Sequence, residues 1–209
     1  MNRLFDMEGP VITFLARITD YMLLNLLFIV CCIPVVTIGA SITALHYVIF
    51  KEVFDQEEPG IFKTFFKAFG QNFKQATAIW LGVLAVAAII ALDVKILTAD
   101  GAHLTGWFLA LIIVVAIAVF VIAMYSLALT ARFENTMRQT IKNAMLMSIR
   151  HAPKSVVMML VYLSPFALVM WQAWGIMAVL LVGFSCAVYI NSFVRKDIFS
   201  IYSSDGQSS

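Results

Sequence analysis

The chain has 209 residues, of which 62% are hydrophobic and 12% are charged, and its mean hydropathy is +0.94. A soluble domain has about 45–50% apolar and about 25% charged residues, so this composition excludes a soluble globular enzyme. The net charge of +2 comes without a basic tail, which argues against a nucleic-acid partner. Because a membrane helix needs about 20 apolar residues, we expect one all-α integral membrane domain over residues 1–209, a helix bundle with about six spans.

The first apolar block predicts two spans rather than one. Residues 21–50 carry no formal charge, and this run is too long for one straight span. Pro34 lacks a backbone donor and Gly39 is flexible, so we expect the helix to break in this region. The resulting prediction is two short spans, near 18–36 and 38–54, joined by a tight hairpin. A single kinked span is the alternative.

An amphipathic segment follows near residues 61–75. Its phenylalanines recur at spacings of three and four, while Lys63, Lys67 and Lys74 occupy the other side. This pattern is typical of a helix that lies in the bilayer interface. A polar-faced extension of the next span has the same pattern and is the alternative.

The rest of the chain predicts four more spans and a second amphipathic helix. The spans are expected near 76–97, 106–131, 154–170 and 174–193. The amphipathic helix is expected near 133–151, where apolar residues repeat every four positions and Arg138 and Lys142 lie on the flank of that stripe.

The basic residues indicate the orientation of the chain. With six spans, Lys95 is the one basic residue of the 14 that does not fall on the side of the termini. Because basic residues are retained in the cytoplasm, we predict a multi-pass protein with both termini cytoplasmic. A five-span alternative would move Arg3 and Arg17 to the other side and weaken this asymmetry.

Motifs of soluble enzymes are absent from the sequence, which has no P-loop, no G-x-G-x-x-G, no H-E-x-x-H and no C-x-x-C pair. We therefore predict no enzymatic activity, no catalytic residue, no cofactor and no metal. Polar residues inside the spans are the remaining candidates, since they are costly in lipid.

Three polar residues of the first two spans have specific predicted roles. Asp20 follows Arg17 by one helical turn, so we expect an ion pair at the start of the span. Asn25 lies deeper and is expected to bond a neighbouring helix. His46 is a candidate for proton or haem binding, but the other two histidines fall in loops, so we expect a packed, hydrogen-bonded side chain.

Small residues four positions apart predict close helix contacts. Gly183 and Ala187 form such a pair, as do Ala78 with Gly82 and Ala87 with Ala91. Small side chains on one face permit close approach, either within the bundle or to another membrane subunit.

Several stretches in this order resemble one family. They are Asn25-Leu26-Leu27, Cys31-Cys32-Ile33-Pro34-Val35-Val36-Thr37-Ile38-Gly39, Ala44-Leu45-His46-Tyr47, Phe65-Phe66-Lys67-Ala68-Phe69 and Lys142-Asn143-Ala144. The chain is similar over nearly its whole length to the YesL-like family of bacterial membrane proteins, a domain of unknown function. The resemblance carries over no catalytic residue. It implies the bacterial plasma membrane and a context beside carbohydrate ABC importers and sugar-responsive two-component systems.

The expected function is that of a non-enzymatic accessory membrane subunit of a carbohydrate ABC importer. Its expected partners are membrane lipids and the permease subunits of the importer. A self-contained small transporter or channel, with a homo-oligomer left open, is one alternative, and the scarcity of polar groups in the spans argues against it. The other alternative is a membrane partner of a sugar-sensing two-component system.

Overall fold

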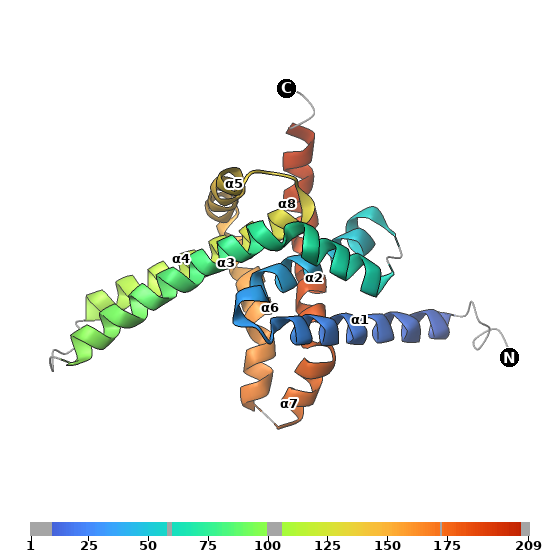
Figure 1. Cartoon of the computed structure of the whole chain (residues 1–209), viewed down its shortest axis with the longest axis horizontal. Coiled ribbons are helices and arrows are strands. Elements are labelled where there is room, and N and C mark those ends of the chain that lie inside the picture. Colours follow the sequence, from blue (N-terminus) through green and yellow to red (C-terminus); the bar gives the residue numbers. More distant parts are fainter. Residues whose placement is uncertain (1–9, 58–59, 100–105, 172, 206–209) are drawn as a thin grey trace.

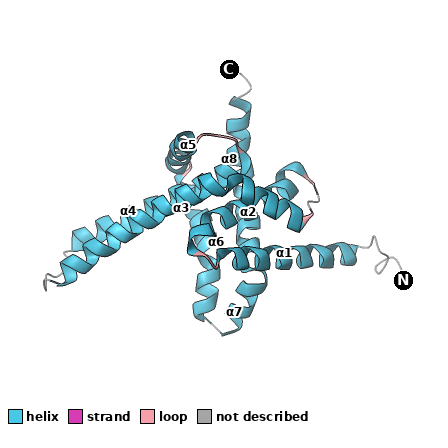
Figure 2. Ribbon diagram, viewed as in Figure 1, coloured by secondary structure: helices cyan, strands magenta, loops and turns pink. Residues whose placement is uncertain are grey.

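The computed structural model describes residues 10–57, 60–99, 106–171 and 173–205 (Figure 1). These ranges hold helices and short connectors, and none of their residues forms a strand (Figure 2). Six of the helices are long and apolar enough to cross a membrane. The chain is therefore an all-α, multi-pass membrane protein, and six spans rather than five account for its apolar segments.

The elements are α1 (Pro10–Cys32), a 3-10 turn (Val35–Thr37), α2 (Ile38–Asp55), α3 (Ile61–Ala99), α4 (Gly106–Arg132), α5 (Met137–Arg150), α6 (Ala152–Trp171), α7 (Ala173–Ala178), a π-helical segment (Val179–Gly183) and α8 (Phe184–Asp205). The last three follow one another without a break and form the sixth span.

The connection between α1 and α2 is the tight hairpin expected around Pro34. The Thr37 hydroxyl donates to the carbonyl oxygens of Cys31, at 2.6 Å, and Pro34, at 2.7 Å, and so satisfies backbone acceptors at the end of α1. Gly39, however, lies inside the first turn of α2 rather than in the break. A Cβ atom there would lie 2.6 Å from Cβ of Trp80 and would collide with the Ala76 carbonyl group. Gly39 is therefore needed for the close approach of α3 to α2, not for flexibility.

The segment 61–75 is not a separate helix lying in the interface. It is the start of α3, which runs without interruption for 39 residues and is about 58 Å long at 1.5 Å per residue. The alternative, an extension of the next span, is the one that the structure adopts. The physical reason is that no proline occurs between residues 61 and 99, so nothing breaks the backbone bonds. With a hydrocarbon core of about 30 Å, a large part of α3 extends beyond it.

The second amphipathic segment does form its own helix, α5, which begins four residues later than expected from the pattern. Residues 133–136 are not helical, and Phe133 of this connector packs edge-on against Phe199, with ring centroids 5.6 Å apart. Ala144 and Met147 of α5 are buried, whereas Arg138 is exposed. The face of α5 that packs on the bundle is therefore the one that carries Thr140, Ala144 and Met147. The predicted stripe of apolar residues at every fourth position is exposed instead, and its members in α5 are Met137, Ile141, Met145 and Ile149.

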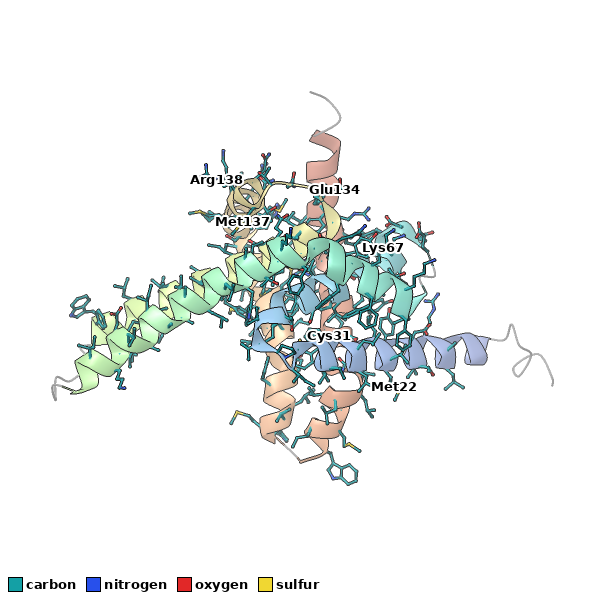
Figure 3. All side chains as sticks on the ribbon, in the orientation of Figure 1. Met22, Cys31, Lys67, Glu134, Met137 and Arg138 are labelled. Carbon is teal, nitrogen blue, oxygen red and sulfur yellow. The ribbon has the colours of Figure 1, made fainter. Side chains whose placement is uncertain are left out.

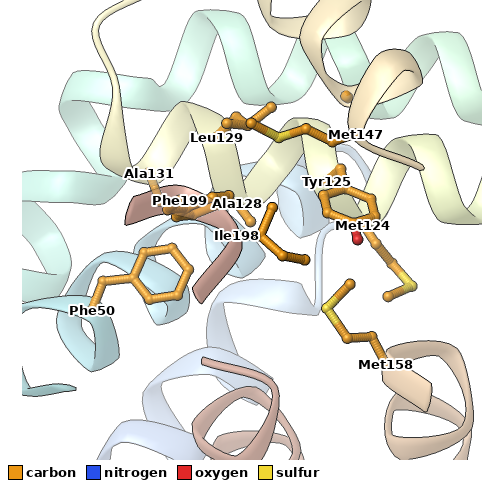
Figure 4. Close-up of a cluster of buried hydrophobic side chains, with 11 residues drawn as sticks. Phe50, Met124, Tyr125, Ala128, Leu129, Ala131, Met147, Met158, Ile198 and Phe199 are labelled. Atoms are coloured by element: carbon orange, nitrogen blue, oxygen red, sulfur yellow. The ribbon is translucent and has the colours of Figure 1, made fainter. Parts of the chain in front are cut away.

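The bundle is built around α2, of whose span 56% is buried, against 11–33% for the other spans. Side chains from α2, α4, α5, α6 and α8 meet in one apolar cluster, which includes Phe50, Tyr125, Met147, Met158 and Ile198 (Figure 4). From this centre the α3–α4 hairpin extends in one direction, and α6 with α7 extends in another (Figure 1).

Candidate functional site

One end of the bundle carries most of the charged contacts, and we call it the charged end. The helices α2 and α4 end here, α3 and α6 begin here, and α5 is also located at this end. The Arg132 guanidinium bonds Asp55 at 2.8 Å, which joins the ends of α4 and α2. Lys67 of α3 and Arg138 of α5 both lie at this end, with Glu134 between them in the view of Figure 3.

The lysine and arginine residues singled out from the amphipathic patterns are all solvent-exposed. They are Lys63, Lys67, Lys74, Arg138 and Lys142. None of them joins an ion pair among the described residues. They make the charged end basic, and they form no enclosed site.

A cavity of about 540 Å³ opens at the charged end between α1, α2, α3 and α8. Asp20 lines it together with Arg17, Tyr21 and Glu52. The Tyr21 hydroxyl donates to Glu52 Oε2 at 2.6 Å and links α1 to α2. The expected ion pair between Arg17 and Asp20 is wrong, since these two described side chains form none. Their helix extends beyond the level of Glu52, where each side chain is exposed to solvent and gains little from pairing.

A second cavity, of about 560 Å³, lies between the ends of α2 and α4 and the last turn of the polar part of α3. Its lining includes Asp55, Gln75 and Arg132. The Gln75 amide donates to the Asn135 carbonyl at 3.2 Å and to the Thr140 hydroxyl at 3.1 Å. This cavity is thus closed on one side by the connector before α5.

Asn25 of α1 is buried and binds the π-helical segment of the sixth span. Its amide nitrogen donates to the carbonyl oxygens of Val179, at 2.9 Å, and Leu180, at 2.7 Å. Its amide oxygen accepts from the backbone N–H groups of Phe184, at 3.0 Å, and Ser185, at 3.1 Å. A π-helical turn is wider than an α-helical one, and Asn25 supplies four polar contacts at this widened turn.

Gly183 is the last residue of this π-helical segment, and Ala187 follows it by about one helical turn. A Cβ atom at Gly183 would lie 3.1 Å from the Val179 side chain, which belongs to the same helical span. Ala187 is buried inside the chain. Of the two expected roles, Ala187 therefore has packing within the bundle, whereas Gly183 is half-buried and contacts its own span.

His46 lies in a polar cluster inside the apolar bundle. Its Nδ1 is 2.7 Å from the Ile42 carbonyl oxygen, so Nδ1 carries the proton and donates it. Its Nε2 is 2.7 Å from the Tyr162 hydroxyl, which therefore donates to Nε2. Both ring nitrogens are occupied by bonds within the protein, which leaves neither to hold a haem or a metal.

Arg195 is the functional candidate that sequence reasoning missed. Its side chain is 0% exposed, and its guanidinium carbon lies 5.4 Å from the centre of the Tyr162 ring. Its Nε, Nη1 and Nη2 atoms have no hydrogen-bond partner among the described residues. Asn191, one turn earlier, is also fully buried and donates to the Met158 carbonyl at 3.3 Å.

A signal for Arg195 was present in the helical period of the sixth span. Val188, Asn191, Ile198 and Phe199 are buried at spacings of three, four or seven from Arg195. Extending the predicted span beyond residue 193 with this period would have placed Arg195 on the buried face. Its position near a run of charges made it resemble a cytoplasmic anchor instead.

These features define an all-α, multi-pass membrane protein with a charged end and a polar cluster in its interior. Residues 21–94, about a third of the chain, match a family described as "Protein of unknown function, DUF624". The match covers Asn25, Gly39 and His46 but ends before α6 and α8, which supply Tyr162 and Arg195. No curated protein and no solved structure is significantly similar to the chain.

Proposed function

We propose that the chain is a YesL-like accessory membrane subunit that binds the permease subunits of a carbohydrate ABC importer and catalyses no reaction. The observation that carries this proposal is the outer part of the α3–α4 hairpin, residues 81–96 and 106–120, which we call the hairpin arm. No side chain of the arm is buried. A pair of long apolar helices without further cover within the described chain is suited to contact lipid on one side and another membrane protein on the other.

Small residues make the hairpin arm suitable for close helix contact. Gly82 is exposed, and a Cβ atom there would meet nothing within 4 Å. Ala87 and Ala91 are exposed on the same helix. Since helices associate in lipid by close packing at small residues rather than by the hydrophobic effect, these positions favour a protein partner. The carbohydrate importer as partner follows from the family resemblance.

The predicted orientation is consistent with a role beside a transporter. Nearly all basic residues lie on the side of the charged end, so we expect that end to face the cytoplasm of a bacterium and the spans to cross its plasma membrane. The exposed Lys63, Lys67, Arg138 and Lys142 would then lie on the side where an ABC permease meets its ATPase subunits.

Affinity purification of the full chain in mild detergent tests the proposal. We expect mass spectrometry to identify permease subunits of a carbohydrate importer with the wild-type chain, and Gly82→Leu to reduce their recovery at least tenfold. Gly70→Leu is the matched control, because Gly70 is also a helical glycine with open space around it but lies outside the hairpin arm. Recovery of the chain without permease subunits, in repeated preparations, would contradict the proposal.

A self-contained transporter is the second candidate, and one observation favours it. The interior holds the buried polar side chains of His46, Asn191 and Arg195, so the spans are less apolar inside than the sequence pattern indicates. A transporter would move solute across liposomes that contain this chain alone. Absence of flux in such liposomes, together with recovery of permease subunits, separates the two functions.

A further inference from the structure

We propose that the cavity at the charged end between α1, α2, α3 and α8 binds the headgroup of a zwitterionic phospholipid that carries a phosphate and a primary ammonium group, as phosphatidylethanolamine does. The cavity has a volume of about 540 Å³. This volume is within the range of about 300–1,000 Å³ that is usual for small-molecule sites. The site is separate from the hairpin arm and does not depend on a protein partner.

The lining of the cavity carries unpaired charges of both signs in equal number. Arg17 of α1 and Lys196 of α8 supply two positive charges, and Asp20 and Glu52 supply two negative ones. None of these four residues joins an ion pair among the described residues. Glu57, the fifth charged residue of the lining, is already paired with a lysine of α2. A ligand with charges of both signs therefore matches this lining, whereas a purely anionic one would meet two carboxylates.

Aromatic rings beside Glu52 mark the place of the ammonium group. The Tyr21 hydroxyl donates to Glu52 Oε2 at 2.6 Å, which fixes the carboxylate and leaves Oε1 able to accept. The rings of Tyr21 and Tyr189 meet edge-on with centroids 5.3 Å apart, and Phe193 is edge-on to Tyr189 at 5.0 Å. Aromatic rings attract a cation, and a carboxylate accepts its N–H groups. A primary ammonium uses both contacts, whereas a trimethylammonium has no N–H to donate.

The two cations of the lining are suited to the phosphate. Arg17 presents a guanidinium, whose N–H groups can bond two phosphate oxygens at once. Lys196 Nζ donates to the Val53 carbonyl oxygen at 3.3 Å. A lysine ammonium carries three donors, so this bond fixes Lys196 at the cavity and leaves two N–H groups for a ligand.

The polarity of the lining changes with depth in the same sense as that of a phospholipid. On α1 the lining changes from Arg17 to the buried Leu24, and on α8 from Lys196 to Tyr189. Each change takes seven positions, or about 10 Å of helix. The buried Val48 of α2 adds to the apolar floor. A phospholipid has a charged headgroup at the interface and apolar groups deeper in the bilayer, so it covers both parts, whereas a soluble phosphoester would leave the floor uncovered.

Thermal unfolding of the purified full chain in detergent tests the site. The melting temperature is measured with the dioleoyl forms of phosphatidylethanolamine, phosphatidylcholine and phosphatidylglycerol at equal mole fractions, and with soluble phosphoethanolamine. We expect phosphatidylethanolamine to raise the wild-type melting temperature in a saturable manner by roughly 5 °C more than the other two lipids do. Soluble phosphoethanolamine should raise it by less than about 2 °C.

Two variants separate the charges of the site. Glu52→Gln keeps an acceptor for the Tyr21 hydroxyl but removes a negative charge, so it should respond equally to phosphatidylethanolamine and phosphatidylglycerol. Lys196→Met should weaken the response to both lipids. Glu134→Gln and Lys67→Met are the matched controls, because both residues are exposed at the charged end and neither lines this cavity. Both controls should keep the wild-type preference.

Three results would overturn the proposal. The first is a wild-type melting temperature that rises equally with the three lipids, which needs no variant and so holds even if a variant fails to fold. The second is a Glu52→Gln variant that folds and keeps the wild-type preference for phosphatidylethanolamine. The third is a response to soluble phosphoethanolamine as large as that to the lipid, which would identify a soluble ligand instead.

Discussion

Replacing Asn25 by leucine removes the polar link between α1 and the sixth span while keeping the size of the side chain. Four hydrogen bonds are lost, two from the amide nitrogen and two to the amide oxygen. Buried hydrogen bonds contribute about 0.5–1.5 kcal/mol each, and those between membrane helices average near the lower end of this range, so we expect a loss of about 2–4 kcal/mol. At about 2–4 °C per kcal/mol for a chain of this size, the melting temperature should fall by roughly 5–15 °C.

The measurement is thermal unfolding in detergent, followed by tryptophan fluorescence and by loss of the monodisperse peak in size-exclusion chromatography. Asn72→Leu is the matched control, because the Asn72 amide bonds only the Ala68 carbonyl of its own helix, at 3.1 Å. We expect that control to change the melting temperature by less than about 2 °C. The control loses one hydrogen bond within its own helix, and water can replace this bond, so its contribution to the free energy of unfolding is near the lower end of the range for a hydrogen bond. If Asn25→Leu and Asn72→Leu melt at the same temperature, the link to the π-helical segment does not stabilise the bundle.

Two further predictions concern the packing of α2. Gly39→Ala should lower the melting temperature by roughly 5 °C or more, because the new Cβ collides with backbone atoms of α3, and such overpacking costs about 1–3 kcal/mol. Gly82→Ala, in open space, should leave it unchanged or raise it slightly, and equal effects of the two alanines would refute the close approach. Tyr162→Phe should cost about 1–3 kcal/mol in unfolding free energy, because His46 Nε2 is left buried without a donor; a stability equal to wild type would show that another group satisfies that nitrogen.

Local patterns were enough to predict most of the helices. Hydropathy over a stretch of 20 residues depends only on that stretch, so the number of spans could be read from the sequence. Their limits were less accurate: α1 ends at Cys32 rather than near 36, and the sixth span continues to Phe199 rather than ending near 193. Pro34 likewise acts on its own backbone, and the hairpin between α1 and α2 forms around it. The segment 61–75 was the exception, because a helix in the interface and a helix that continues a span have the same amphipathic pattern. Only the backbone between residues 74 and 76 distinguishes them.

The site depended on contacts between residues far apart in the chain. Asn25 forms a hydrogen bond with Val179, and His46 forms one with Tyr162. The residues next to Asn25 and His46 in the sequence do not indicate which distant residue each of them bonds. Arg195 appeared as one of many basic residues beside a span, and its burial follows from the packing of α8 against α2 and α6.

By itself, the sequence determined the membrane class, the six spans and the basic character of one end, because these properties follow from the side chains and backbone of each segment alone. The tertiary structure decided that Gly39 permits a close helix contact, that Asn25 binds a π-helical turn, and that Arg195 places an unmatched charge beside Tyr162. The physical reason is that burial and hydrogen bonding are properties of how helices pack against each other, and a residue's own sequence neighbours do not determine that packing.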